Sequence, residues 1–247
     1  MMTGSFTEQD SAAPGRLGDG TRVYAVGDVH GCDARLAALH RSIADDLARR
    51  PIERPQLVHL GDYIDRGPDS AGVIARLAAG PPLPGVPTVN LRGNHEQMML
   101  DSLADPSAMT QWLANNGADT LAGWGIPASA DPRSWTGSIP LKALSFLAGL
   151  ELMHVVDGYV FVHAGLRPGV PLARQTPDDL MWIRKAFLNW PGQLVPDAPG
   201  LVAVHGHTSA PVPEVRRNRI GIDTGAVSGG ALTCVVLEGA RLRYLTA

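Results

Sequence analysis

Cysteine is almost absent from this sequence. Only Cys32 and Cys234 occur among 247 residues, so a disulfide framework is excluded and the count fits a reducing compartment. Neither cysteine has an arginine six positions further along, where Ala38 and Ala240 stand instead. The phosphate-binding loop of cysteine-dependent phosphatases is therefore missing.

Excess charge and long apolar runs are missing as well. The net charge is −3 at pH 7, so the chain lacks the basic footprint that binds nucleic acid regardless of sequence. No stretch approaches the roughly 18 uninterrupted apolar residues of a membrane helix. Residues 1–20 are small and polar, unlike a secretory signal. We expect a soluble, cytoplasmic monomer that has neither a membrane nor a nucleic acid as partner.

The order of apolar and polar segments indicates the fold class. Residues 1–20 are expected to form a disordered tail, and residues 21–247 a single domain. Short apolar runs at 21–28, 56–62 and 86–94 alternate with helical spacing at 33–50, 70–80 and 95–105. This alternation predicts an α/β fold with a mainly parallel sheet. Residues 106–140, rich in Trp, Gly and Asn, are interpreted as an excursion over the sheet edge.

Polar side chains of the same kind follow five of the predicted strands. In α/β sheets, ligands gather at the carboxyl ends of the strands, so we expect these side chains to converge. The glycines beside them allow sharp turns around a small, crowded site. The residues concerned are Asp28, His30, Asp62, Asp65, Arg66, Arg92, Asn94, His95, His163, His205 and His207.

These residue types point to a metal site. Carboxylate, imidazole and amide oxygen together suit Mn²⁺, Fe or Zn²⁺. The ligands are too many for one ion, and an aspartate can bridge two ions in the arrangement that hydrolyses phosphoesters. Planar guanidinium groups bind a phosphate dianion best, and Arg66, Arg92 and Arg184 are the candidates.

Other histidines have a plainer interpretation. His40, His59 and His154 have no motif around them and are interpreted as core or surface residues. His205 lies two positions before His207, and three roles remain open for it: a metal ligand, a partner of a ligand, or a histidine of the core.

Three blocks of the sequence resemble a known family. GDVHG, GDYIDRG and RGNHE resemble the signature blocks of the phosphoprotein phosphatases of the calcineurin-like metallophosphoesterase superfamily, in particular the bacterial and lambda-phage-type serine/threonine protein phosphatases. VHAG, MWIR, HGHT and IDTGA fit the later blocks of that group. The resemblance extends from about residue 21 to the last residue.

The resemblance implies a fold and a metal centre. The implied fold is a central β-sandwich of mixed sheets flanked by helices. The implied cofactors are two divalent metal ions, with Mn²⁺ favoured and Fe or Zn²⁺ as alternatives. The first ion would be held by Asp28, His30 and Asp62. The second would be held by Asp62, which bridges the two, and by Asn94, His163 and His207.

The resemblance also implies an activity. The enzyme would hydrolyse phosphoserine and phosphothreonine, and also phosphotyrosine, in protein substrates by attack of a water that the metal pair activates. His95 resembles the proton donor of the family, and Asp65 the residue that orients it. Arg66, Arg92 and Arg184 would bind the phosphate oxygens.

Two other interpretations remain. Symmetrical diadenosine tetraphosphatases share related blocks, and a base-binding pocket in the excursion between Trp112 and Trp135 would favour a dinucleotide substrate. A catalytically idle scaffold that docks phosphoproteins predicts eroded motifs, whereas every ligand and arginine is present. Many phosphodiesterases of the superfamily carry a second histidine in GHxH, and Ser209 stands at that position here, which favours the phosphoprotein phosphatase branch.

Overall fold

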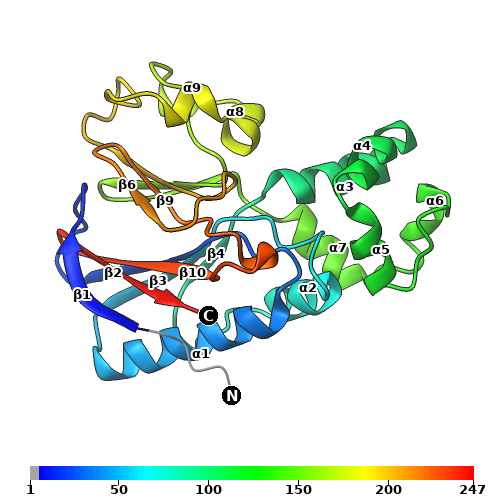
Figure 1. Ribbon diagram of the computed structural model, residues 1–247, viewed down its shortest axis with the longest axis horizontal. Coiled ribbons are helices and arrows are strands. Elements are labelled where there is room, and N and C mark those ends of the chain that lie inside the picture. Colours follow the sequence, from blue (N-terminus) through cyan, green and yellow to red (C-terminus); the bar gives the residue numbers. More distant parts are fainter. Residues whose placement is uncertain (1–5) are drawn as a thin grey trace.

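Two β-sheets stacked face to face form the centre of the protein (Figure 1). The computed structural model describes residues 6–247. The first sheet has the strand order β1-β11-β10-β2-β3-β4, and the second has the order β5-β6-β7-β9-β8. Apolar side chains of both sheets, among them Val23 and Phe161, share one buried cluster. The predicted β-sandwich of mixed sheets flanked by helices is confirmed.

The strands of the first sheet are β1 (Phe6–Ala12), β2 (Thr21–Val26), β3 (Arg54–His59), β4 (Thr88–Asn90), β10 (Thr233–Glu238) and β11 (Arg241–Thr246). Those of the second are β5 (Met153–Val156), β6 (Tyr159–Val162), β7 (Val202–His205), β8 (Glu214–Val215) and β9 (Arg219–Gly221). The three strands predicted to be parallel, β2, β3 and β4, are parallel. β10 and β11 extend this sheet in the antiparallel direction.

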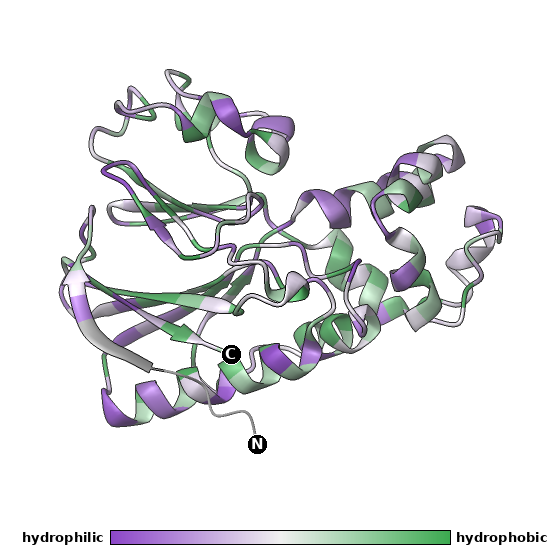
Figure 2. Ribbon diagram, viewed as in Figure 1, coloured by the Kyte–Doolittle hydropathy of each residue, from purple (hydrophilic) through white to green (hydrophobic). Residues whose placement is uncertain are grey.

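Helices cover the outer faces of both sheets. On β2, Tyr24 and Val26 alternate with Val23 and Ala25, so one pair faces the helices and the other faces the second sheet. Apolar residues of α1 lie toward the sheet and polar residues toward solvent (Figure 2). The helices that belong to the first sheet are α1 (Asp33–Arg49), α2 (Ser70–Ala78), α3 (Asn94–Ala104) and α7 (Leu141–Ala148). The second sheet has α8 (Pro177–Trp182) and α9 (Lys185–Leu188).

The excursion forms short helices that extend to one side of the sandwich (Figure 1). They are α4 (Met109–Ala114), α5 (Gly117–Gly123) and α6 (Pro132–Trp135). The fully buried rings of Trp112 and Trp135 lie 5.5 Å apart, centroid to centroid, and belong to the same apolar cluster as Leu36 of α1. The excursion is therefore packed onto the main core. Among residues 6–247, no helix is both long and apolar enough to span a membrane.

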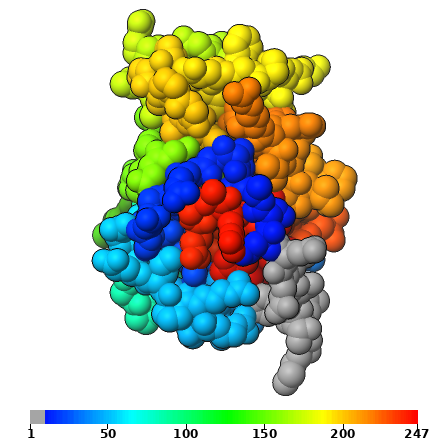
Figure 3. Space-filling model, turned by 90° about the vertical axis from the view of Figure 1, so that its left-hand side faces the viewer, coloured from blue at the N-terminus to red at the C-terminus, as the bar shows by residue number. Residues whose placement is uncertain are grey.

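The predicted disordered tail over residues 1–20 is wrong for residues 6–20. β1 pairs antiparallel with β11, with Phe6 opposite Leu245, and Figure 3 shows the two segments side by side. Leu17 is fully buried between the sheets. An edge strand can be held by backbone hydrogen bonds, so the polar sequence of this segment carried little strand signal. Residues 1–5 of the predicted tail lie outside the described residues.

Candidate metal centre and catalytic site

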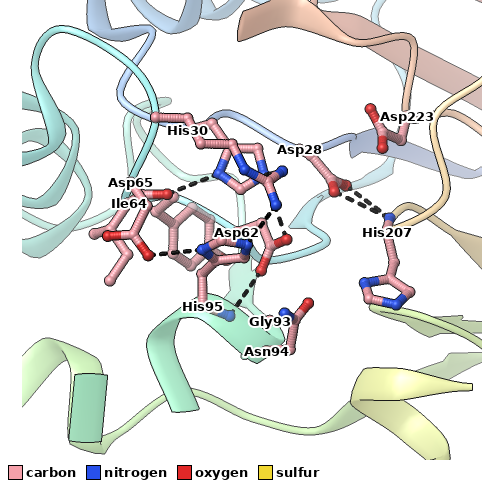
Figure 4. A network of polar contacts seen from close by, with 12 residues as sticks. Asp28, His30, Asp62, Ile64, Asp65, Gly93, Asn94, His95, His207 and Asp223 are labelled. Carbon is pink, nitrogen blue, oxygen red and sulfur yellow. Dashed lines mark hydrogen bonds and ion pairs between the residues drawn. The ribbon is translucent and has the colours of Figure 1, made fainter. Parts of the chain in front are cut away.

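The predicted site residues converge because five strands end at the same edge of the sandwich. β2 ends two residues before Asp28, and β3 ends three residues before Asp62. In the second sheet, His163 directly follows β6 and His207 lies two residues after β7. Figure 4 shows most of the resulting cluster, and each of the six predicted metal ligands is buried.

The backbone of this cluster has an unusual conformation. Seven non-glycine residues among 6–247 have positive φ, and five of them are His30, Asp62, Asp65, Arg66 and His207. Left-handed backbone is costly for most side chains, and Asp and His tolerate it better than most. Such conformations persist where the surrounding structure determines them strongly, which is common at functional sites.

Two sets of potential metal ligands share one carboxylate. The first set is His30, Asp62 and His95, and the second is Asp62, His163 and His207; in each, the ligand atoms lie within 4.8 Å of one another. Asp62 belongs to both sets, which agrees with the bridging role implied for it. The donor types suit Mn²⁺, Fe or Zn²⁺.

Hydrogen bonds set the direction in which the imidazoles present their nitrogens. Nδ1 of His30 lies 2.7 Å from the carbonyl oxygen of Ile64, and Nδ1 of His163 lies 3.0 Å from that of Leu60. In this arrangement Nδ1–H donates to the carbonyl and Nε2 is left as the ligand atom. Nε2 of His207 is buried and has no hydrogen-bond partner among the described residues. These residues therefore fit a metal centre.

Asn94 and Asp28 complete the predicted ligand set from opposite sides. Oδ1 of Asn94 lies 3.0 Å from Nε2 of His163, within the second set. Asp28 lies outside both sets, where its two oxygens accept the backbone N–H of His207 at 3.2 and 3.0 Å. Burial and the neighbouring Asp223 raise the pKa of Asp28 well above its usual range. A bound cation would relieve this repulsion between carboxylates.

The shared carboxylate has the opposite electrostatic environment. Burial alone would raise the pKa of Asp62, but the imidazoles of His163 and His95 outweigh burial and hold that pKa well below its usual range. For His163, burial works to lower the pKa, and the charge of Asp62 overcomes it and raises the pKa to about 9. An imidazole must be neutral to bind a metal, so binding would displace this proton.

A buried pair next to the metal ligands has the geometry of an oriented acid. Oδ2 of Asp65 lies 2.6 Å from Nδ1 of His95, and both residues are almost fully buried. Asp65 also accepts hydrogen bonds from Nε1 of Trp112 at 2.8 Å and Oγ1 of Thr120 at 2.6 Å. The carboxylate thus fixes the tautomer of His95 and points its Nε2 into the site.

The three predicted phosphate-binding arginines have different positions. Arg66 donates to Nε2 of His30 at 2.8 Å and to Nε2 of His95 at 2.9 Å, so its guanidinium lies within the site. Arg184 is exposed, and its Nη1 lies 3.5 Å from Oγ1 of Thr208. Arg92 instead donates to Gln97 and to the carbonyls of Ala148 and Leu150, so the structure does not bring its guanidinium to the cluster. A phosphate-binding role for Arg92 stays a prediction.

Sequence reasoning missed Glu96 and the two residues that hold Asp65. Glu96 is fully buried and accepts the backbone N–H groups of Gly93, Asp62, Tyr63 and Ile64. Burial, followed by the charge of Asp62, raises its pKa to about 7. The signal was present in RGNHE, where an acid follows the predicted donor. Trp112 and Thr120 lie in the QWLANNGADT block, whose letters alone do not show which residue they contact.

Comparison with known proteins assigns the family. A family model of calcineurin-like phosphoesterases matches residues 21–227. The chain belongs to that family. It is 33% identical over 226 residues to the serine/threonine-protein phosphatase 1 of Salmonella typhimurium, across 87% of this chain and 92% of the relative. A symmetrical bis(5'-nucleosyl)-tetraphosphatase of Janthinobacterium sp. is 27% identical, also across 87% and 92%. That of Paracidovorax citrulli is 33% identical over 147 residues, which span 45% of its length.

Two solved structures have a similar fold. A putative diadenosine tetraphosphatase superposes with a TM-score of 0.62 at 24% identity, over 92% of this chain and 93% of that one. A cold-active protein-tyrosine phosphatase of a psychrophile Shewanella sp. gives a TM-score of 0.56 at 17% identity, over 93% and 80%. At these identities the likeness concerns the fold. The chain is thus a metallophosphoesterase with a candidate dinuclear metal site.

Proposed function

We propose that this protein is a phosphatase that hydrolyses phosphoserine and phosphothreonine, and also phosphotyrosine, in protein substrates. One observation carries the choice over a dinucleotide. The indole rings of Trp112 and Trp135 are fully buried and contact each other, so they are not free to stack on a base. Trp112 instead holds Asp65. The 33% identity to a serine/threonine-protein phosphatase over 92% of that relative also supports the choice.

The residues of the site would divide the work between binding and proton transfer. Arg66 lies beside the ligands, and Arg184 lies at the exposed mouth, so both can neutralise phosphate oxygens as charge develops on them. His95, oriented by Asp65, would protonate the leaving alkoxide of serine or threonine in its doubly protonated form, in which Nε2 carries a proton and no longer accepts from Arg66. Two divalent ions, which we propose to be Mn²⁺, would polarise the phosphoryl oxygens and lower the pKa of the attacking water.

A second candidate is hydrolysis of a symmetrical dinucleoside tetraphosphate. It is favoured by the Janthinobacterium relative, which carries that name and matches the chain over 92% of its own length. Both substrates are phosphate esters or anhydrides that the same cluster of ligands and arginines could bind. The two candidates therefore differ in what lies around the cluster, and not in the cluster itself.

A direct comparison of the two substrates tests the proposal. Purified protein is stripped of metal and supplied with Mn²⁺. Phosphate release is then measured from phosphoserine and phosphothreonine peptides, and ADP formation from diadenosine tetraphosphate, because symmetrical hydrolysis of the dinucleotide yields two ADP and no free phosphate. We expect kcat/KM for the peptides to exceed that for the dinucleotide. The Asp62→Asn variant serves as the blank for contaminating activity. A dinucleotide hydrolysed faster than every peptide would contradict the proposal and favour the second candidate.

A further inference from the structure

A groove leads away from the catalytic cluster along the second sheet. Its cavity volume is about 590 Å³, in the usual range for ligand sites. At its inner end, Ser209 donates to Asp223 at 2.7 Å, and Figure 4 shows Asp223 beside Asp28. At its outer end lie Trp190 and Arg217, both exposed. None of the proposed metal ligands lines the groove, but Thr208, which lines it, directly follows His207 in the chain, so the groove borders the catalytic cluster.

The groove carries an excess of positive charge. Three arginines, Arg216, Arg217 and Arg219, line it together with two carboxylates. One carboxylate, Glu214, is engaged by Arg216 at 2.6 Å and by Arg219 at 2.8 Å. Arg217 is exposed and makes no hydrogen bond or ion pair to another residue of the described chain. Its guanidinium is available to an anionic ligand.

Two buried polar atoms on the wall of the groove also lack partners. His205 is 2% exposed, and its Nδ1 lies 3.0 Å from the carbonyl oxygen of Gly206, so Nδ1 donates and Nε2 is an acceptor. Neither Nε2 of His205 nor Nε of Arg219 has a hydrogen-bond partner among residues 6–247. Buried polar groups are normally paired, so an unpaired acceptor and an unpaired donor on one wall point to a ligand that supplies both partners.

The walls of the groove are held together before any ligand binds. Nδ2 of Asn218, next to β9, donates to the carbonyl oxygens of Trp190 at 2.9 Å and Gly192 at 2.8 Å. This ties the segment after α9 to the turn between β8 and β9. A preformed groove loses little conformational entropy on binding.

We propose that this groove binds an acidic segment that flanks the phosphorylated residue of a protein substrate; the inference rests on the proposed phosphatase function. A glutamate or aspartate side chain complements Arg217 and the Nε–H of Arg219. A peptide N–H complements the acceptor of His205, and Trp190 offers an apolar surface for the stem of a side chain. Substrate choice would then depend on acidic residues near the phosphate.

The test uses matched peptides and matched variants. One phosphothreonine peptide carries three glutamates beside the phosphorylated residue, and its counterpart carries glutamines. The variants are Arg217→Gln and, as control, Arg41→Gln on the exposed face of α1. We expect the wild type to prefer the acidic peptide about tenfold in kcat/KM. Arg217→Gln should reduce this preference about fivefold, through a higher KM for the acidic peptide. Turnover of the neutral peptide and of p-nitrophenyl phosphate, and the melting temperature, should stay unchanged in both variants.

The outcomes separate this inference from the proposed function. If the wild type hydrolyses both peptides equally well, or Arg217→Gln leaves the preference intact, the groove has no such role while the phosphatase activity stands. If no peptide is hydrolysed and the dinucleotide is, both proposals are overturned. A slower dinucleotide reaction in Arg217→Gln would then assign the groove to the second nucleotide.

Discussion

Nε1 of Trp112 lies 2.8 Å from Oδ2 of Asp65, although 47 residues separate the two along the chain. This hydrogen bond joins the excursion to the pair formed by Asp65 and His95. It gives the helices α4 to α6 a role in aligning the proposed proton donor. Substitution of a single tryptophan of the excursion can therefore test this role.

Trp112→Phe should reduce turnover of phosphoserine peptides by about three- to tenfold, because Asp65 loses one of the bonds that hold it. Trp135→Phe is a matched control: its ring is equally buried, but its Nε1 has no hydrogen-bond partner among the described residues. Steady-state kinetics of both variants on one peptide checks this. Equal losses would show that packing, and not the hydrogen bond, matters.

Asp62→Asn should lower turnover by more than about 100-fold and lower the metal content, because both sets of ligands lose their shared carboxylate. Asp45→Asn, on the exposed face of α1, is the control. Metal analysis after dialysis, together with phosphate release, gives the answer. Near-normal activity with two bound ions would rule out a bridging role for Asp62.

His95→Asn should slow hydrolysis of phosphoserine peptides by about 100-fold or more, since a serine alkoxide leaves poorly without a proton. The effect on p-nitrophenyl phosphate should be much smaller, because p-nitrophenolate is a stable leaving group. The ratio of the two losses is the measurement. An equal loss on both substrates would count against His95 as the acid.

Glu96→Gln should destabilise the fold by about 3 kcal/mol, because the amide turns a donor toward backbone N–H groups that the carboxylate accepts. Denaturant unfolding of the metal-free variant and wild type provides the comparison. Gln97→Glu, at the neighbouring half-buried position, should change the free energy of unfolding by less than about 1 kcal/mol. An unaltered stability of Glu96→Gln would show that the carboxylate does not organise this loop.

Acid should destabilise the protein through two core histidines. Burial lowers the pKa of His40 to about 4 and that of His59 to about 3, and their Nε2 atoms lie 2.9 Å apart. Below pH 6.5 these two histidines bind protons in the unfolded chain but stay neutral in the folded chain. The free energy of unfolding therefore falls as the pH falls toward 4. Between pH 6.5 and pH 5, the free energy of unfolding falls by at most about 2 kcal/mol for each histidine.

His40→Gln should flatten this pH dependence, which urea unfolding at pH 7 and pH 5 would measure. His154 is a partly exposed histidine on β5, and His154→Gln should leave most of the pH dependence unchanged. If His40→Gln loses as much stability between the two pH values as the wild type, His40 is not the source.

The sequence predicts that the proposed metal ligands lie close together, because each lies in a short block beside a strand end. Asp28 and His30, or Asn94 and His95, are a few positions apart, so local backbone geometry decides their placement. Local reasoning also identified α1 and α2 to within two residues at each end. Of the three histidines interpreted as core or surface residues, His40 and His59 are buried in the core and His154 is partly exposed.

Contacts across long stretches of chain could not be predicted in this way. The bonds of Thr120 to Asp65, the turn of Asp28 toward His207 and the pairing of β1 with β11 depend on packing between distant segments. Arg92 shows the same limit. Its place in RGNHE suggested a contact with the phosphate, but its guanidinium donates to the carbonyls of Ala148, the last residue of α7, and Leu150.

The left-handed backbone at His30, Asp62, Asp65, Arg66 and His207 affects how mutagenesis of this site must be interpreted. Replacement by alanine changes the chemistry and also adds a conformational penalty, so alanine scanning would overstate the chemical contribution of each side chain. Exchange of Asp62 for glutamate keeps the charge but gives up the residue type that tolerates this conformation. Asparagine is the replacement that isolates the chemistry, because it adopts the left-handed region as readily as aspartate.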